Sequence, residues 1–226
     1  MRTDRINKID IPSYTLDQEK FNSLSHFLGV PIGLIIIAIS IASFITFGFE
    51  VKYLISLLIF GLSVIALYFV SGSYHGENPI NAKHKKLLRI ADHCTIFFLI
   101  AGTYTPISIY IYSYNGIGLA ILIIEWVLAA IGVILNIIDF TNPTVKSLSM
   151  FLYLALGWLI LFSGGFTYLP ISAFAFVLVG GIVYTIGSIL YGIGHKNLTF
   201  HSVFHVFVLL STILQAVGIL SLFINL

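Results

Sequence analysis

Histidine is the residue type whose placement in this sequence of 226 residues best indicates chemistry. The run His201-Ser-Val-Phe-His205 places two imidazoles at positions i and i+4. On a helix these positions lie one turn apart on one face, so both rings can reach a single metal ion. Histidine nitrogen suits zinc, which needs at least one further ligand. The same spacing also fits two polar residues that end a helix without binding a metal, and both interpretations stay open at this point.

Three other polar residues fall at the ends of apolar stretches. His75 ends the second stretch and is the natural third ligand, and Ser71 lies four residues before it on the same helical face. Asp92 opens the third stretch, where an ionisable group is costly unless it is paired or functional. Three histidines with a nearby carboxylate have the composition of a catalytic zinc centre, whose fourth position holds water.

Several other polar residues fall inside or beside the apolar stretches. Glu125 lies in the middle of one and is interpreted as a neutral carboxylic acid bonded to a neighbouring helix, with a proton-relay role as the alternative. Asn136 and Gln215 are expected to bond between helices. His93 lies about 100° around the helix from Asp92, so we expect the two to face different surroundings. No role is assigned to His26.

The elements that must position these residues are membrane helices. The sequence is 58% hydrophobic and 9% charged, whereas soluble domains are about 45–50% apolar and about 25% charged. A water-soluble globule is therefore excluded. Lipid-embedded backbone requires helices or closed barrels, and the apolar stretches lack barrel-type alternation. The sequence predicts an all-α integral membrane protein, a seven-transmembrane helix bundle with spans at 27–48, 53–73, 90–112, 117–138, 147–166, 171–191 and 200–224.

The segment before the first span is polar. Residues 1–26 hold eight charged residues, which does not fit the short basic start of a cleavable signal peptide. We expect a cytoplasmic N-terminal arm over 1–26 and a single transmembrane domain over 27–226. The net charge of +2, with no basic stripe, gives no indication of nucleic-acid binding. The one cysteine, Cys94, excludes an intrachain disulfide.

Lysine and arginine are distributed unequally between the two sides of the predicted bundle. Only Lys52 falls on one side. The other side receives ten basic residues, namely Arg2, Arg5, Lys8, Lys20, Lys83, Lys85, Lys86, Arg89, Lys146 and Lys196. Because cytoplasmic loops are enriched in basic residues, the N-terminus is expected inside and the C-terminus outside. All seven histidines, including His84 and His195, then lie toward the cytoplasmic side.

Four motifs occur in order along the chain. They are Asn22-Ser-Leu-Ser-His26 with Gly29, Ser71-x-x-x-His75, the block from Ala91-Asp92-His93-Cys94 to Ala101-Gly102-Thr103-Tyr104-Thr105-Pro106, and His201-Ser-Val-Phe-His205. In these motifs the sequence resembles the hemolysin III family, the bacterial branch of the progestin and adipoQ receptor proteins, grouped with alkaline ceramidases as membrane hydrolases. The resemblance extends from Glu19 through nearly the whole chain. Gln215, where relatives often carry histidine, and Ala91 depart from the family pattern.

The resemblance implies a seven-helix bundle in the plasma membrane, with zinc near the cytoplasmic face. His75, His201 and His205 match the family's zinc ligands. Asp92 matches the acid that holds the catalytic water, and Ser71 matches the serine beside the metal. The departures at Gln215 and Ala91 do not touch these positions.

Three functions from different classes remain after this comparison. The first is a zinc-dependent hydrolase that cleaves an amide or ester bond of a membrane lipid, in the manner of a ceramidase. The second is a sensory or receptor-like membrane protein in which zinc only joins helices. The third is the cytolytic activity that the family name suggests, ranked last because no span shows the continuous polar stripe of a water-filled lumen.

The charge asymmetry predicts a topology that reporter fusions can measure. A reporter in the loop at 76–88 should give a cytoplasmic signal, and a reporter fused after Leu226 should give the opposite signal. Matching signals at the two positions would overturn the seven-span topology.

Overall fold

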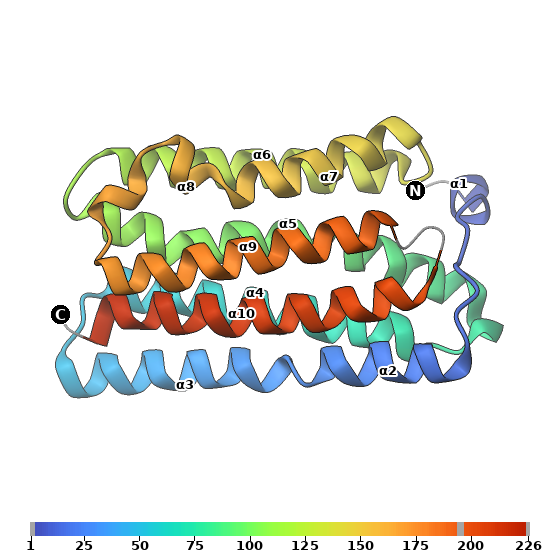
Figure 1. The fold of residues 1–226 in the computed structure, drawn as a ribbon, viewed down its shortest axis with the longest axis horizontal. Coiled ribbons are helices and arrows are strands. Elements are labelled where there is room, and N and C mark those ends of the chain that lie inside the picture. The colour runs from blue at the N-terminus through green and yellow to red at the C-terminus, as the bar shows by residue number, and fades with distance from the viewer. Residues whose placement is uncertain (1–2, 194–196, 225–226) are drawn as a thin grey trace.

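The chain folds into long helices that run side by side along one axis (Figure 1). A computed structural model describes residues 3–193 and 197–224, and within that part the regular elements are all helical. The helices are α1 (Thr3–Asn7), α2 (Leu16–Phe27), α3 (Val30–Phe47), α4 (Val51–Gly76), α5 (Ala82–Tyr112), α6 (Ile117–Asp139), α7 (Pro143–Gly157), α8 (Leu159–Phe162), α9 (Ile171–Ile193) and α10 (Thr199–Ile224), with 3₁₀ turns η1 (Pro79–Asn81) and η2 (Gly165–Tyr168).

Six of the helical segments in the described part of the chain are long and apolar enough to cross a membrane. They are Leu16–Phe47, Val51–Gly76, Pro79–Tyr112, Ile117–Asp139, Ile171–Gly192 and Thr199–Phe223. The expected span at 147–166 is not one continuous helix. It consists of α7 and α8, which meet at Trp158 and lie beside α6 (Figure 1).

The break between α7 and α8 is explained by a tyrosine from α5. Trp158 leaves helical geometry, with φ −105° and ψ 5°. The Tyr104 hydroxyl donates to the Gly157 carbonyl oxygen at 2.9 Å and accepts from the Ile160 amide at 3.2 Å. A side chain that enters the backbone hydrogen-bond ladder is a known cause of a sharp kink. The Trp158 indole nitrogen also donates to Thr185 on α9, at 3.0 Å, and so ties the break to the bundle.

Helix α2 occupies residues that the sequence assigns to the N-terminal arm. Thr15 begins it with a capping box, in which its side chain accepts from the Gln18 amide and Gln18 bonds back. The buried face of α2 carries Asn22, Ser25 and His26. Helix α2 then leads into α3 along one side of the bundle (Figure 1). The arm is therefore part of the helical packing from residue 16 onward.

The remainder of the arm is attached to the bundle by backbone carbonyls. Arg5 donates to the Ile138 carbonyl oxygen, and Arg89 donates to that of Asp10. Ile9 is buried against Ile90 and Phe140. The first residues of the described chain thus lie across the same end of the bundle as the N-terminal end of α5.

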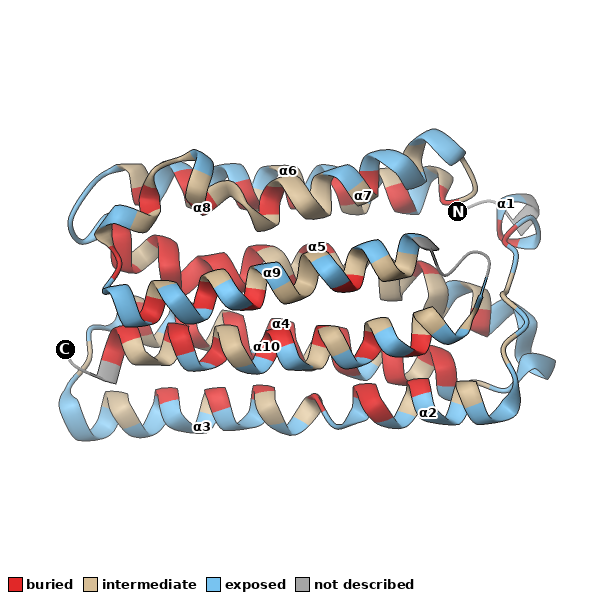
Figure 2. Cartoon of the chain, viewed as in Figure 1, coloured by how far each residue is buried: buried red, intermediate tan, exposed pale blue. Residues whose placement is uncertain are grey.

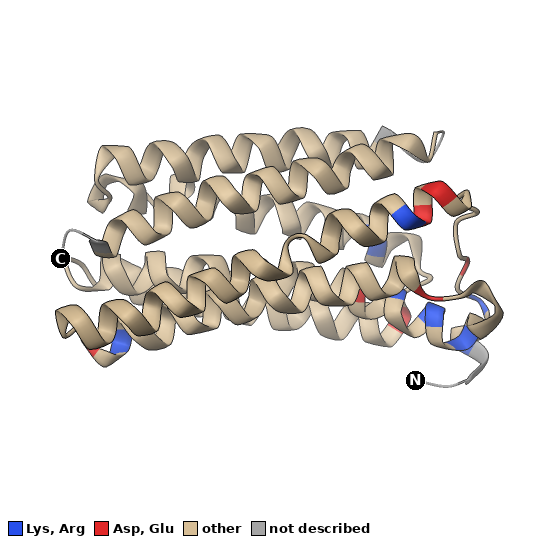
Figure 3. Ribbon diagram, turned by 90° about the horizontal axis from the view of Figure 1, so that it is seen from below, with Lys and Arg blue, Asp and Glu red and all other residues tan. Residues whose placement is uncertain are grey.

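Burial and charge follow the membrane environment. Buried residues lie mainly where helices face one another, while α3 exposes much of its outer surface (Figure 2). Charged residues gather at the end where α1 lies, and a smaller group lies at the opposite end (Figure 3). That smaller group includes the ion pair of Lys52 with Glu50, at 2.9 Å. Arg2, His195, Lys196 and Leu226 lie outside the described residues.

Helices α3 and α4 approach each other closely at two glycines. A Cβ atom added to Gly33 would lie 2.6 Å from the Gly61 carbonyl oxygen and 2.6 Å from Ile65. Backbone atoms cannot yield as a flexible side chain can. Glycine at position 33 therefore permits this helix contact.

We expect Gly33→Ala to lower the free energy of unfolding by about 1–3 kcal/mol, because the added methyl must push α3 away from α4. Thermal unfolding of the detergent-solubilised protein measures this loss. Gly116→Ala is the matched control, since its added Cβ has no atom within 4 Å and its φ is −58°. Equal melting temperatures for the two variants would contradict the prediction.

Candidate metal centre

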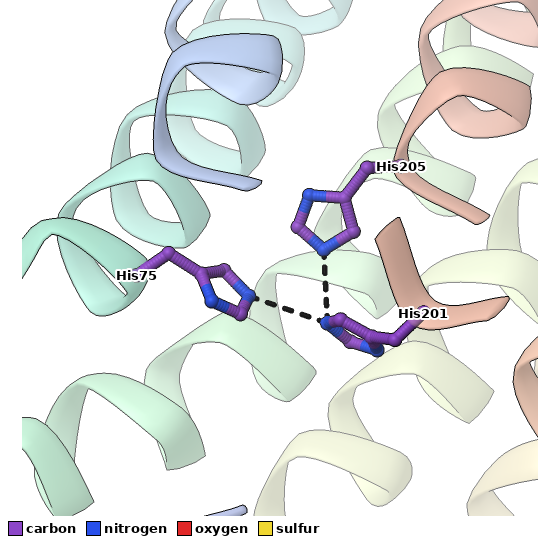
Figure 4. A group of neighbouring side chains, drawn as sticks. All are labelled: His75, His201 and His205. Carbon is purple, nitrogen blue, oxygen red and sulfur yellow. Dashed lines mark hydrogen bonds between the residues drawn. The ribbon is translucent and has the colours of Figure 1, made fainter. Parts of the chain in front are cut away.

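Two helices bring three imidazoles together at the end of the bundle that carries most of the charge. His75 lies in the last turn of α4, and His201 and His205 lie in the first two turns of α10. One ligand atom from each histidine lies within 4.8 Å of the others. The Nε2 atoms of His201 and His75 are 3.3 Å apart, and those of His205 and His201 are 3.0 Å apart (Figure 4). The three residues could therefore hold one metal ion.

The spacing of these nitrogens can be compared with a tetrahedral site. A metal–nitrogen distance of about 2.0–2.1 Å corresponds to about 3.3 Å between two ligands of a tetrahedron. Two of the three nitrogen separations, 3.3 Å and 3.0 Å, are close to this value. An imidazole nitrogen offers one hydrogen or one lone pair, so Nε2 of His201 cannot hydrogen-bond well to both neighbours. A cation among three lone pairs satisfies all three nitrogens, and the residues therefore fit a metal ion.

The second nitrogen of His75 is held by a carboxylate that the sequence analysis did not single out. Nδ1 of His75 lies 2.6 Å from Oε2 of Glu19 on α2. The other carboxylate oxygen, Oε1, accepts from Nζ of Lys85 at 2.8 Å. A carboxylate on the far side of a ligating histidine is the usual partner that orients such rings. A sequence signal existed, since Glu19 lies three residues before Asn22 and seven before His26, on one face of α2.

Aromatic rings enclose the three histidines. Tyr14 lies 5.5 Å from the His75 ring and 5.2 Å from the His201 ring, and Tyr191 lies 5.5 Å from His201. The His26 ring is tilted 31° to the His205 ring, with centroids 3.7 Å apart. Burial raises the pKa of the Tyr14 hydroxyl above its usual value.

A cavity of about 540 Å³ lies next to the histidines. His201 and His205 line it, together with His26. Asp92 and Ser71, the two candidate catalytic residues, line the same cavity. The predicted carboxylate and hydroxyl therefore border the same cavity as two of the three predicted ligands.

His93 does not face different surroundings from Asp92, contrary to the expectation from helix geometry. Both residues line the cavity, and Nδ1 of His93 lies 4.0 Å from the Asp92 carboxylate. A cavity bordered by several helices can accept side chains from two adjacent positions, whereas a contact with one neighbouring helix cannot. The two residues were expected to face different sites, which was wrong because several helices border this cavity.

The other polar residues have separate surroundings. Asn136 donates to Gly132 and to Ser149, and so joins α6 to α7. Gln215 lines the cavity. The Glu125 carboxyl is buried and forms no hydrogen bond within the described part of the chain, so the bond expected for it is not seen.

His84 lies apart from the three histidines. It is exposed and lies 2.5 Å from Glu77. Hydrogen bonds from Asn81 and from His84 hold the pKa of the Glu77 carboxyl below its usual value. These contacts organise the loop after α4 and not the candidate metal centre.

Comparison with known proteins identifies the family. The sequence model of the family described as haemolysin-III related matches residues 14–216. The chain belongs to this family. It is 33% identical over 198 residues to the Hemolysin-3 homolog of Bacillus subtilis (strain 168), covering 87% of this chain and 90% of the relative. It is 31% identical over 194 residues to Hemolysin-3 of Bacillus cereus, covering 85% of each chain.

Removal of two ligands tests the metal centre of this haemolysin-III-related protein. We expect the purified parent to carry one divalent metal ion per chain and the variant His201→Ala/His205→Ala to lose it, because a single imidazole binds weakly. Elemental analysis measures the content. The variant His84→Ala removes an imidazole outside the cluster and should keep the metal. A folded double variant with full metal content would contradict the assignment.

Proposed function

We propose that this protein is a zinc-dependent hydrolase that cleaves an amide or ester bond of a membrane lipid. The observation that carries the proposal is that one cavity is lined by Asp92, Ser71, His201 and His205. A carboxylate and a hydroxyl beside a set of three nitrogen ligands are the groups that metal-assisted hydrolysis requires.

The proposal includes an orientation in the cell membrane. The N-terminus lies in the cytoplasm and the C-terminus outside, and α7 with α8 forms a seventh crossing beside the six continuous segments. The concentration of charged residues at one end of the bundle supports this orientation (Figure 3). The metal centre then lies on the cytoplasmic side.

Zinc is the proposed ion because three imidazoles suit it and because two of the nitrogen separations are close to those of a tetrahedral site. Three protein ligands leave a fourth position open, as in catalytic zinc sites. When bound, the ion supplies a Lewis acid that activates water and polarises a carbonyl oxygen. The histidines bind only in the neutral form, so metal affinity and activity should both fall in mild acid.

The chain's own residues supply the remaining groups. The Asp92 carboxylate orients the attacking water and accepts its proton as a general base. The Ser71 hydroxyl donates a hydrogen bond to the attacking water, or to the carbonyl oxygen next to the cleaved bond as negative charge develops on that oxygen. Both residues can act in this way because they border the space in which the substrate would lie.

The cavity also favours a lipid over a water-soluble substrate. Much of its lining is apolar, including Leu67, Ile96, Leu99, Ile100, Leu154 and Val208. These side chains suit an acyl chain, while Asp92, Ser71, His201 and His205 supply polar groups to the same cavity. A lipid whose polar linkage reaches the headgroup region places that linkage near Asp92.

A second function deserves a test because the ligands come from helices far apart in the sequence. His75 on α4 and His201 on α10 are separated by 126 positions, so an ion between them would join the two helices without any catalysis. A zinc-stabilised sensor would use the site in this way. Lytic activity, suggested by the names of the two relatives, ranks third because the described helices expose apolar side chains outward, as an integral membrane protein does.

The variant Asp92→Asn separates the hydrolase from the sensor. Asparagine has nearly the shape of aspartate but cannot accept the proton. We expect the variant to keep its zinc and its melting temperature and to lose about 10²–10⁴-fold in fatty-acid release from a mixed lipid extract.

Asp17→Asn is the matched control, since Asp17 is exposed in the first turn of α2. It should retain both zinc and activity. If Asp92→Asn instead loses zinc and melts at a lower temperature, Asp92 is a fourth ligand of a closed site and the sensor is favoured. An unchanged rate would reject Asp92 as the base.

A further inference from the structure

A chain of buried polar contacts leads away from the metal centre. Glu19 stands at its middle, with Oε2 at 2.6 Å from Nδ1 of His75 and Oε1 at 2.8 Å from Nζ of Lys85. Lys85 also donates to the Glu77 carbonyl oxygen at 2.9 Å. The exposed fractions of the side chains are 0% for His75, 1% for Lys85 and 15% for Glu19.

The burial of Lys85 requires an explanation. Withdrawing an ammonium group from water is costly unless it is paired and hydrogen-bonded. Glu19 supplies the opposite charge, the Glu77 carbonyl accepts a second hydrogen bond, and the Tyr74 ring lies 5.4 Å away. These contacts fix the carboxylate of Glu19, because Oε1 is held by Lys85 while Oε2 faces His75.

The consequence for His75 concerns its tautomer. A carboxylate accepts a hydrogen from Nδ1, so the neutral ring carries its proton there and presents a lone pair at Nε2. Nε2 is the atom that lies 3.3 Å from Nε2 of His201. The carboxylate therefore determines which nitrogen of His75 is available to a metal ion.

The same contacts fix the position of the ring in space. Glu19 belongs to α2, His75 to α4 and Lys85 to α5. Glu77 immediately follows the last turn of α4, where a cation that binds a free carbonyl stabilises the helix end. Three helices are thus joined within a few ångströms of one metal ligand, which limits how far its ring can move.

We propose that Glu19, held by Lys85, is a positioning residue that fixes the tautomer and the orientation of His75 for metal binding. This inference rests on the zinc site of the proposed function. Glu19 does not touch the metal or the substrate, and it acts through His75 alone.

The test is the zinc affinity of the detergent-solubilised protein, measured by competition with a chelator of known affinity. Glu19→Ala should weaken zinc binding by about 10–100-fold, the usual effect of losing such an outer partner. Glu19→Gln keeps an oxygen that accepts from Nδ1 and should lose less. The matched control is Glu50→Ala, which removes a carboxylate paired with Lys52 at the opposite end of the bundle and should leave the affinity unchanged.

Repeating the Glu19→Ala change in a His75→Ala variant distinguishes a positioning role of Glu19 from a general loss of structure. In His75→Ala, the further change Glu19→Ala should have no additional effect on zinc affinity, because the residue through which it acts is gone. Equal losses in both backgrounds would overturn the inference. If Glu19→Ala does not fold because Lys85 is left without its partner, the variant Glu19→Ala/Lys85→Met removes both charges and should show the same 10–100-fold loss.

The remaining outcomes are distinct. A parent that binds zinc, with Glu19→Ala binding it equally well, would overturn this inference and leave the metal site intact. A parent that binds no zinc would overturn the metal site and this inference together. Loss of lipid hydrolysis is not needed as a readout in either case.

Discussion

The convergence of three imidazole nitrogens determines much of how this end of the bundle is built. They come from the C-terminal end of α4 and the N-terminal end of α10, so both helices must end at the same level. Buried imidazoles need partners, because a polar group in a low-dielectric interior is costly when it has none. Glu19 meets this need for His75 and brings α2 against α4. One of the contacts that hold the N-terminal helix against α4 is therefore made by a histidine of the cluster.

The cluster of three histidines could be predicted in part from local spacing. His201 and His205 occupy one helical face by sequence distance alone, and His75 was the histidine at the end of another apolar stretch. The fold class, an all-helical membrane protein, was predicted from the amino-acid composition and from the lack of barrel-type alternation. Glu19 was missed because its shared helical face with Asn22 and His26 indicates burial only, whereas its contact with His75 spans 56 positions. The prediction that His93 and Asp92 face different sites was wrong for a related reason. The width of the cavity depends on how several helices pack together, which the local sequence does not contain.

The break at Trp158 shows the other limit of sequence reasoning. The stretch at 147–166 is apolar enough to predict a span, and its interior gives no strong helix breaker other than glycine. The kink depends on Tyr104, which lies 53 positions before Gly157. Hydropathy measures how apolar a segment is. It contains no information about a hydrogen bond from another helix, such as that of the Tyr104 hydroxyl. The length of the segment was predictable and its continuity was not.

The Tyr104 hydroxyl has one further consequence for the cavity. A broken helix in lipid leaves a carbonyl and an amide unsatisfied, and each costs several kcal/mol. A phenol is one of the few side-chain groups that can both give and receive a hydrogen bond through a single atom, so one oxygen closes both gaps. Tyr104, Gly157 and Trp158 all line the cavity. The irregular backbone between α7 and α8 therefore faces the cavity. The cavity wall at this position depends on one oxygen atom that both donates and accepts a hydrogen bond. Phenylalanine has almost the same size as tyrosine but could not replace it, because it lacks this oxygen.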